Sequence, residues 1–560
     1  MWADQMCINQ QDKVEKNEQV RLMSAIYPKA STVLCWLGED DGTVEQAFCI
    51  LREWAAVADE NLKREDARQR KLRSKVAAKT VKALSEDVGA DGALARLFHR
   101  SWWRRAWTLQ EVCPSKDNRP ILLCGQHQLL WYHFYLACFN MFHTLDASVR
   151  TQAFSSAITY VLPMLQTSWA DKENLRLSNL IWIAAEREAT DPCDKVHALL
   201  GITASTGLRY PVADYTLSTE KACIKYTRAI IDCEKNLDIL MVVARPLPND
   251  TGPSWCMKID KLRGETPLLD WHNRSRMGGH KFDATLRRPP SVTPSRSDLD
   301  ATLQLEGLPV DTVDCLISAS AIIEPLESAG YTWPAVLQCV AKVCSLQGLP
   351  SHYGRTGSSA PAALLNTITT ASFCVTAQGS LKSQSSQWHN LYYAYQSIAL
   401  SHPKDFGNGP PSDSPEAFMS YVQKEFDFQG KVESKGIGVH NAPGPADKGG
   451  MALSWLERRV CSELLRTIKS SSDERCIFLT RTGYLGLGPL DARPGDHVCL
   501  LFGSSVPFML RPWRRHSDTV YELLDEVYCE GIMQGEGLGA YVIDGDLVAP
   551  AGGWPKYTLV

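Results

Sequence analysis

The chain has 560 residues, enough for roughly two to four domains. Its net charge of −4 offers no electrostatic basis for binding nucleic acid or an anionic membrane. No apolar stretch suits a signal peptide or a membrane span. The 18 cysteines include no C-x-x-C pair, so we expect free thiols in a reducing compartment and no zinc site or other metal site.

The first part of the chain is expected to alternate strands and helices. Residues 1–8 and 31–37 are short apolar runs that predict buried strands. Apolar residues recur at helical spacing in 14–27, where Pro28 is expected to end the helix, and again in 43–58. Strands alternating with helices favour a parallel sheet with helices on its faces, so the pattern predicts an α/β domain.

The tryptophan-rich segment and a hairpin are expected to complete this domain, and a helical region to follow it. Residues 101–112 (SWWRRAWTLQEV) have helical periodicity, residues 120–131 predict a hairpin that turns near Gly125, and residues 132–234 have a helical pattern.

One helix in this region carries its own start and stop signals. Asp191 can cap it, Pro192 fits the first helical position, Asp194 would lie in the first turn, and Gly201 would end it.

The C-terminal part is expected to be α+β with a β-rich tail. Short strands are predicted at 477–480, 496–502, 508–511 and 523–529, separated by turns. The glycines of 483–488 are followed by proline and no helix, so we interpret them as a β-turn rather than a dinucleotide loop. The polar, proline-rich stretch 278–300 is the best linker candidate. The predicted domains are therefore 1–131 (α/β), 132–277 (helical), 278–300 (linker) and 301–560 (α+β).

Several sequence blocks share a family resemblance. The chain opens with WADQMCINQ, followed by Q-V-x-x-M-x-x-I-Y and V-L-x-W-L-G; later blocks read WWRRAWTLQE, DPCDKVHALLG and G-x-L-G-L-G-P. These blocks resemble the fungal heterokaryon-incompatibility (HET) domain family, whose motif positions include Arg105, Asp191 and Asp194 here. An L-S-Y-x-W-G block usually precedes the first of them, so residues 1–131 are expected to be a partial HET domain with an incomplete sheet.

Polar side chains at the end of the first predicted strand form one candidate ligand site: Asp4, Cys7, Asn9 and Gln10. Open α/β sheets bind ligands at the carboxyl ends of their strands, where Asp4 could reach a ribose hydroxyl and Asn9 or Gln10 an amide or base. The alternative is that Asn9 and Gln10 cap the following helix or turn. Trp36 could stack on a nicotinamide or adenine beside this pocket, or could belong to the core.

Glu111 is the candidate catalytic residue. Trp107 and Glu111 are similar to the W-x-x-x-E element of Toll/interleukin-1 receptor (TIR) domains, whose flavodoxin-like sheet the HET fold distantly resembles. In enzymatic members that glutamate carries cleavage of the NAD glycosidic bond. The resemblance implies that Glu111, desolvated by Trp107, would stabilise the ribosyl centre or orient a water, with NAD as substrate. The alternative is a structural ion pair with Arg104 or Arg105.

The resemblance implies a cytoplasmic fungal protein of non-self recognition and cell-death signalling. Such a protein would act through induced proximity, by protein partners or self-association through the HET domain, and would require no cofactor. Two other hypotheses remain open: a TIR-like NAD glycohydrolase that uses Glu111, and a degenerate scaffold without catalysis. Neither nucleic acid nor a membrane span is expected.

Overall fold

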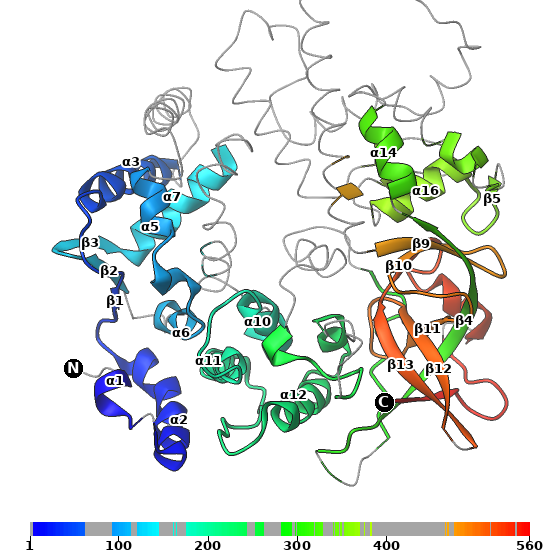
Figure 1. Cartoon of the computed structure of the whole chain (residues 1–560), viewed down its shortest axis with the longest axis horizontal. Helices are drawn as coiled ribbons and strands as arrows, with labels where there is room; N and C mark the ends of the chain where they lie inside the picture. The colour runs from blue at the N-terminus through cyan, green and yellow to red at the C-terminus, as the bar shows by residue number, and fades with distance from the viewer. Residues whose placement is uncertain are drawn as a thin grey trace, which may run out of the picture. The chain divides into compact units, whose positions relative to one another are not determined.

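The computed structural model divides the chain into two compact units, residues 1–234 with 257–264 and residues 235–256 with 265–560 (Figure 1). The structure describes residues 4–9, 11–61, 92–113, 120–144, 161, 164, 175–242, 252–261, 282–293, 297, 299–318, 320–328, 340, 342–346, 348–349, 352–369, 374–375, 381–382, 465, 468–469, 475–515, 517–543 and 546–560.

The first unit begins with two helices rather than a strand. Helix α1 spans Asp4–Cys7, so the strand predicted for residues 1–8 is wrong over the described part. A short apolar run is compatible with either state, and only its surroundings decide between them. Helix α2 spans Lys13–Lys29 and confirms the predicted helix, although Pro28 lies inside its last turn. Asp12 caps α2 by accepting hydrogen bonds from Val14 N and Glu15 N.

A mixed three-stranded sheet follows in the order β1–β2–β3, confirming an N-terminal α/β region. Strand β1 (Leu34–Trp36) is parallel to β2 (Ile121–Cys124), which forms the predicted hairpin with β3 (His127–Leu130). The hairpin turns at Gly125, where φ is +55° and a Cβ would lie 2.6 Å from Asp40 Cβ. The turn therefore needs glycine for both its conformation and its close contact with the loop after β1.

Two helices cover this sheet and pack against each other. Helix α3 (Val44–Asn61), which was predicted, contacts β3 and α7 (Trp131–Thr144). Side chains of α3 such as Phe48, Leu51 and Trp54 are fully buried. Their burial provides the main stabilisation of this region.

The tryptophan-rich segment is not one continuous helix. After α5 (Ala93–Phe98) it forms a 3₁₀ turn, η1 (Ser101–Arg104), and then α6 (Thr108–Val112). The interruption arises because Arg105 forms a parallel bridge with Glu188 and Ala106 N donates to Glu188 O (3.0 Å). A backbone pairing with a distant segment thus replaces local helical bonds.

The middle of the first unit is helical, as predicted. It contains α10 (Leu177–Ala184), α11 (Asp194–Leu200), the 3₁₀ turns η4 (Ile202–Thr206) and η6 (Ile259–Lys261), and α12 (Thr219–Glu234). Helix α11 starts two residues later than predicted, since the Asp191 carboxylate accepts from Cys193 N (3.0 Å) ahead of it. Gly201 has φ −66° and continues into η4, which ends instead at Gly207 with φ +78°.

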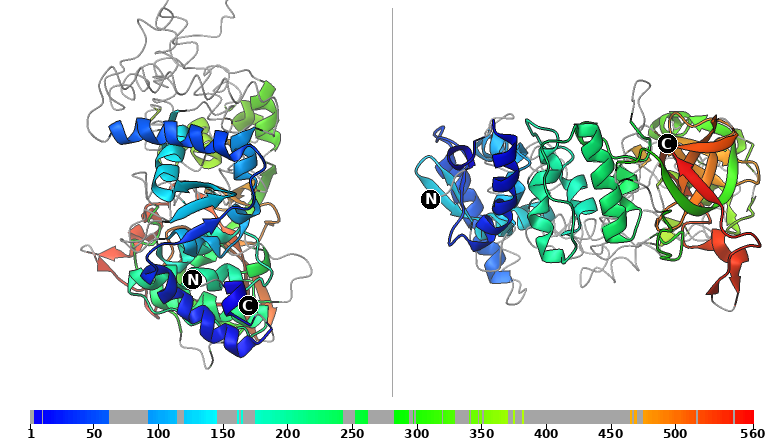
Figure 2. Two further views of the ribbon diagram at one scale, coloured as in Figure 1. Left: turned by 90° about the vertical axis from the view of Figure 1, so that its left-hand side faces the viewer. Right: turned by 90° about the horizontal axis from the view of Figure 1, so that it is seen from below.

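The second unit is built on a closed five-stranded barrel, confirming a β-rich C-terminal region (Figures 1 and 2). The barrel order is β11 (His497–Leu501), β12 (Phe508–Arg515), β13 (Asp518–Glu526), β17 (Lys556–Leu559) and β4 (Leu303–Ser318), and β4 pairs back with β11. Strand β4 was not predicted, because glycine and proline inside a strand are unfavourable. Its Gly307 is required, since a Cβ there would lie 2.5 Å from Leu500 O.

The far half of β4 extends the barrel into a second sheet. It pairs with β9 (Arg475–Thr480), followed by β10 (Leu485–Pro489) and β14 (Tyr528–Cys529). These positions confirm the predicted strands at 477–480, 496–502, 508–511 and 523–529, but β10 corrects the interpretation of 483–488 as a turn throughout. The smaller elements are η5 (Asp238–Val242), α14 (Ser320–Ser328), β5 (His352–Tyr353), β6 (Ser358–Ser359), α16 (Ala360–Ile368), β7 (Cys374–Val375), β8 (Leu381–Lys382), η7 (Glu536–Tyr541), β15 (Val542–Ile543) and β16 (Asp546–Leu547).

Part of the expected linker 278–300 packs into this second unit. Phe282 and Thr285 are buried, and Thr285 Oγ1 donates to Ser504 O (2.6 Å). Val292 forms a bridge with Leu305 of β4. The described residues 282–293 therefore pack against the barrel. Their polar composition had instead suggested an exposed linker.

We predict that Gly486→Ala destabilises the barrel unit by about 1–3 kcal/mol. A Cβ at Gly486 would lie 2.2 Å from the Phe478 ring and 2.6 Å from Tyr528 O, so both strands beside β10 would have to shift. Urea unfolding of the full chain measures the change. Gly539→Ala is the matched control, since a Cβ there meets nothing within 4 Å. Equal midpoints for the two variants would contradict this account.

Candidate functional site

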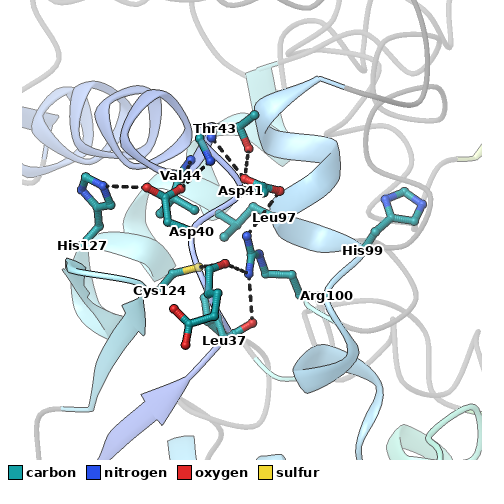
Figure 3. A network of polar contacts seen from close by, with 12 residues as sticks. Leu37, Asp40, Asp41, Thr43, Val44, Leu97, His99, Arg100, Cys124 and His127 are labelled. Atoms are coloured by element: carbon teal, nitrogen blue, oxygen red, sulfur yellow. Dashed lines mark hydrogen bonds and ion pairs between the residues drawn. The ribbon is translucent and has the colours of Figure 1, made fainter.

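The loop between β1 and α3 lies at the carboxyl end of the parallel strands, where open α/β sheets bind ligands. Arg100 reaches this loop from the end of α5 and donates to Leu37 O (3.3 Å) and Glu39 O (2.7 Å) (Figure 3). Its guanidinium also lies 3.4 Å from the Asp41 carboxylate, which accepts from Thr43 N (3.1 Å) and Thr43 Oγ1 (2.6 Å). A distant basic side chain thus closes the loop.

Asp40 ties the same loop to α3 and to the hairpin. Its carboxylate accepts from Gly42 N (2.9 Å) and Val44 N (3.4 Å), and its other oxygen lies 3.2 Å from His127 Nε2 (Figure 3). Carboxylates therefore occupy the N-terminus of α3, where a phosphate would otherwise be favoured. Within the residues that the structure describes, no group of three or more His, Cys, Asp and Glu side chains could hold a metal ion.

Glu111 lies half-buried on α6, against the buried face of the sheet. Trp102 Nε1 donates to Glu111 Oε2 (3.0 Å), and the Cys35 thiol of β1 also bonds this carboxylate. Burial, and then the nearby Glu111 charge, raises the pKa of Cys35 well above its usual value, so the thiol stays neutral and donates. Arg104, one expected ion-pair partner of Glu111, forms an ion pair with Glu188 at 3.3 Å.

The ligand candidates near the start of the chain lie ahead of α2. Asp4 and Cys7 are in α1, Cys7 is exposed, and Gln10 lies outside the described residues. Asn9 forms the turn before α2: its side-chain oxygen accepts from Gln11 N (3.1 Å) and its backbone N–H donates to the Glu15 carboxylate (3.0 Å). Asn9 therefore has the turn-forming role that was the alternative to ligand binding, and a ligand role for these residues stays a prediction.

The two candidate tryptophans occupy different environments. Trp36 is 48% exposed, and because successive strand residues point to opposite faces, it points away from Cys35 and Glu111. The expectation of a core Trp36 is therefore wrong. Trp107 is partly buried and its indole bonds the Asp194 carboxylate, so it belongs to a different cluster.

That cluster, which we call the Asp194 junction, joins α2, Trp107, α11 and Tyr215. The Tyr215 hydroxyl donates to Asp194 Oδ1 (2.5 Å), and Lys16 Nζ lies 3.9 Å from the same oxygen and 3.8 Å from the Tyr215 ring centroid. Asn17 Oδ1 accepts from Tyr215 N (2.8 Å). Burial raises the pKa of Asp194, while the Tyr215 hydroxyl, Lys16 and Trp107 oppose the rise. Three separate sequence blocks therefore meet at one carboxylate.

Gln110 makes a second contact between the same blocks. Its side chain lies on Gly201, where a Cβ would approach Gln110 Nε2 to 2.0 Å and Ser24 Cα of α2 to 3.2 Å. Gly201 therefore leaves room for the Gln110 side chain and does not terminate the helix. This contact explains why glutamine and glycine occupy these two motif positions.

His197 on α11 is buried beside the junction. Its ring lies 4.6 Å from the Tyr215 ring and 5.7 Å from the Tyr226 ring, between centroids. Neither ring nitrogen has a hydrogen-bond partner. Burial lowers the pKa of His197 to about 4, so it is a neutral packing residue at pH 7.

Sequence reasoning missed several of these residues. Lys16 lies on a charged helix and resembles an ordinary solvent-facing side chain, and no local pattern marks Arg100 as a partner of residues about sixty positions earlier. Gln110 was present in the block WWRRAWTLQE, but that block carried no information about its partner.

We predict that the first unit loses stability between pH 7 and pH 4 partly through His197. Its folded pKa is depressed below the unfolded value, so the contribution is present above about pH 6.5 and is lost as the pH falls towards 4. The loss should be about 3 kcal/mol. His197→Leu should reduce the pH dependence by that amount, measured by urea unfolding followed through tryptophan fluorescence. Parallel pH profiles for the two proteins would contradict the prediction.

Comparison with known proteins adds independent findings. The family described as heterokaryon incompatibility protein (HET) matches residues 1–111, and the Het-6 beta-barrel domain matches residues 441–539. Heterokaryon incompatibility protein 6, OR allele, of Neurospora crassa is 25% identical over 587 residues, covering 96% of this chain and 81% of that protein. No solved structure matches the chain. The chain is a member of the HET-domain heterokaryon-incompatibility proteins, with a HET region at its start and a Het-6-type barrel at its end.

Proposed function

We propose that this protein acts in fungal non-self recognition and triggers regulated cell death through its HET region. The observation that carries the proposal is the alignment with the Neurospora crassa incompatibility protein along 96% of the chain, together with the HET match over residues 1–111. In this proposal the protein works in the cytoplasm and signals by contact, with protein partners or with itself. No helix among the described residues is long and apolar enough to cross a membrane.

The finer fold proposal is a TIR-like, flavodoxin-style sheet in the HET region. The parallel β1–β2 pair, whose connection carries α3, α5 and α6, supports it. The Asp194 junction would then hold α2 against the helical middle, so that the HET region presents one fixed surface to a partner. A surface built from several segments needs such a junction, because binding costs less free energy when the surface is ordered beforehand.

We predict that regulated expression of the chain in a filamentous fungus arrests growth and admits a membrane-impermeant dye. Lys16→Glu should strongly reduce this effect, because the new carboxylate would face Asp194 where Lys16 Nζ now lies 3.9 Å away. Lys13→Glu is the matched control: it makes the same charge reversal on the same helix at an exposed position. Equal killing by both variants would refute the role of the junction, and survival of every wild-type transformant would refute the proposed function.

An NAD glycohydrolase is the second candidate function. Its support is the environment of Glu111, a half-buried carboxylate held by the Trp102 indole and the Cys35 thiol beside a parallel strand. In that reaction Glu111 would orient a water or stabilise the ribosyl centre, and Asp4 and Asn9 would hold the nucleotide. The carboxylates at the N-terminus of α3 weigh against a pyrophosphate at that helix, so contact signalling remains the first proposal.

The glycohydrolase candidate predicts that purified protein releases nicotinamide from NAD and that Glu111→Gln lowers the rate at least about a hundredfold. Glu188→Gln is the matched control, since Glu188 is an exposed carboxylate in the same unit. Chromatography of the reaction products measures the release. If no nicotinamide forms even when the protein is forced to cluster, the enzymatic candidate is wrong and a non-catalytic scaffold remains.

A further inference from the structure

The side chain of Arg288 lies over two aromatic rings of the barrel unit. Its guanidinium carbon is 4.3 Å from the centroid of the Phe502 ring and 5.0 Å from that of the Trp554 ring. These two rings are nearly perpendicular, with centroids 4.9 Å apart, and the Tyr541 ring packs on Trp554 at 5.4 Å. The faces of aromatic rings attract cations, so this aromatic corner (Phe502, Trp554 and Tyr541) suits a guanidinium group.

The barrel itself fixes the two rings that Arg288 contacts. Phe502 N donates to Glu306 O (3.0 Å), and Gly307 N donates to Pro555 O (3.1 Å), so both rings flank the same part of β4. With Arg288 in place, Phe502 is fully buried and Trp554 is 9% exposed. The aromatic corner is therefore built by the barrel strands and their ends, whereas the arginine comes from the segment that precedes β4.

The guanidinium of Arg288 has no polar partner within the residues that the structure describes. Other arginines of the same unit bind carboxylates: Arg475 bonds Glu526, and Arg511 bonds Asp496 at 2.9 Å. A guanidinium carries five N–H donors, and these normally find acceptors in a specific site. Because only ring contacts hold Arg288, another guanidinium could make the same contacts in its place.

The turn that carries Arg288 to the rings is strained. Leu286 and Arg287 both have a φ of +52°, in the left-handed region that favours glycine. The turn is held locally, since Arg287 N donates to the Asp283 carboxylate (2.6 Å) and Leu286 N to Asp283 O (3.1 Å). Strain of this kind costs a free energy similar to that of a cation–π contact. The seated position of Arg288 is therefore only weakly favoured.

Hydrogen bonds anchor the chain on both sides of this turn. Thr285 Oγ1 donates to Ser504 O (2.6 Å) before it, and Glu306 N donates to Ser291 O (3.2 Å) after it. Between these anchors, no backbone group of residues 286–290 bonds to the barrel in the described part of the chain. These residues can therefore move away from the rings while the barrel strands and both anchors stay in place.

We propose that the aromatic corner is a binding site for a guanidinium group, and that Arg288 occupies it as an internal ligand until an external guanidinium displaces it. Displacement relaxes the turn at Leu286 and Arg287, so binding is coupled to a movement of residues 286–290. Arg288 itself indicates the ligand class, because a planar, weakly hydrated guanidinium stacks on aromatic faces better than an ammonium does. The group comes from an arginine side chain of a protein or from free arginine.

Arg288→Ala in the full chain tests whether the site exists. The probe is methylguanidinium, titrated by saturation-transfer NMR. We expect the variant to bind it at least about tenfold more tightly than wild type, because no tethered competitor remains. Arg481→Ala removes an exposed arginine of the same unit and should behave as wild type. Adding Trp554→Leu to Arg288→Ala should abolish binding, whereas adding Trp513→Leu, at a 55% exposed position, should not.

A matched pair of variants at Arg287 tests the strained turn. Arg287→Gly and Arg287→Ala both remove the contact with Asp283, which joins Arg287 Nε to the carboxylate at 3.4 Å. Only glycine adopts the left-handed conformation without strain, so it should hold Arg288 on the rings more firmly. Methylguanidinium should therefore bind the glycine variant at least about threefold more weakly than the alanine variant.

Short peptides identify the source of the group. Tighter binding of acetyl-Gly-Arg-Gly-amide than of free arginine to Arg288→Ala would support a protein ligand, and the reverse order would support a small molecule. The corresponding lysine peptide should bind at least about fivefold more weakly than the arginine peptide.

The proposal is overturned if Arg288→Ala binds methylguanidinium no more tightly than wild type, if the two Arg287 variants bind it equally, or if the lysine peptide binds as well as the arginine peptide. The readout is binding by the purified chain. A protein that binds the probe but does not kill cells would therefore refute the proposed function alone, and one that kills cells without binding it would refute only this site.

Discussion

The first unit depends on one buried carboxylate. Asp194 accepts hydrogen bonds from the Tyr215 hydroxyl and the Trp107 indole, and Lys16 approaches it from α2. Burying a carboxylate without such donors would cost several kcal/mol. The donors together offset that cost, so losing one of them would leave the carboxylate only partly compensated. Because the donors come from three segments far apart in the chain, satisfying this one group fixes where α2, α6 and α11 lie relative to each other.

The same reasoning explains the remaining motif positions. Gln110 packs on Gly201. Arg104 O accepts from Glu188 N and Ala106 N donates to Glu188 O, so the tryptophan-rich segment is connected to the helical middle on several sides. Trp103 is fully buried and stacks on Phe134 at 5.0 Å between centroids. Most of the HET-block residues described here therefore contact residues of other blocks and hold the first unit together. Glu111 differs in being half-buried, with a neutral thiol and an indole as donors.

Different interactions stabilise the second unit. Its barrel is closed by β4, a long strand that pairs with β17, β11 and β9, and its tight places are occupied by glycines that a Cβ would obstruct, Gly307 and Gly486. Buried ions are also present, since Arg475 lies between Asp525 and Glu526. Charges buried in a small barrel have to be paired. Here the contacts of Arg475 with the two carboxylates link the start of β9 to the end of β13.

The sequence by itself determined the helices of 14–27 and 43–58, the hairpin at 120–131, the short barrel strands and the family, because these depend on local periodicity, turn residues and motif spacing. Only the tertiary structure decided that residues 4–7 are helical, that the helix predicted for 101–112 is interrupted at Arg105, and that the glycine at 201 packs under Gln110. The last two depend on partners far away in the chain. The tertiary structure also decided that Trp36 is exposed: an apolar strand predicts burial, but which of its faces is covered is a property of the neighbours that pack on it.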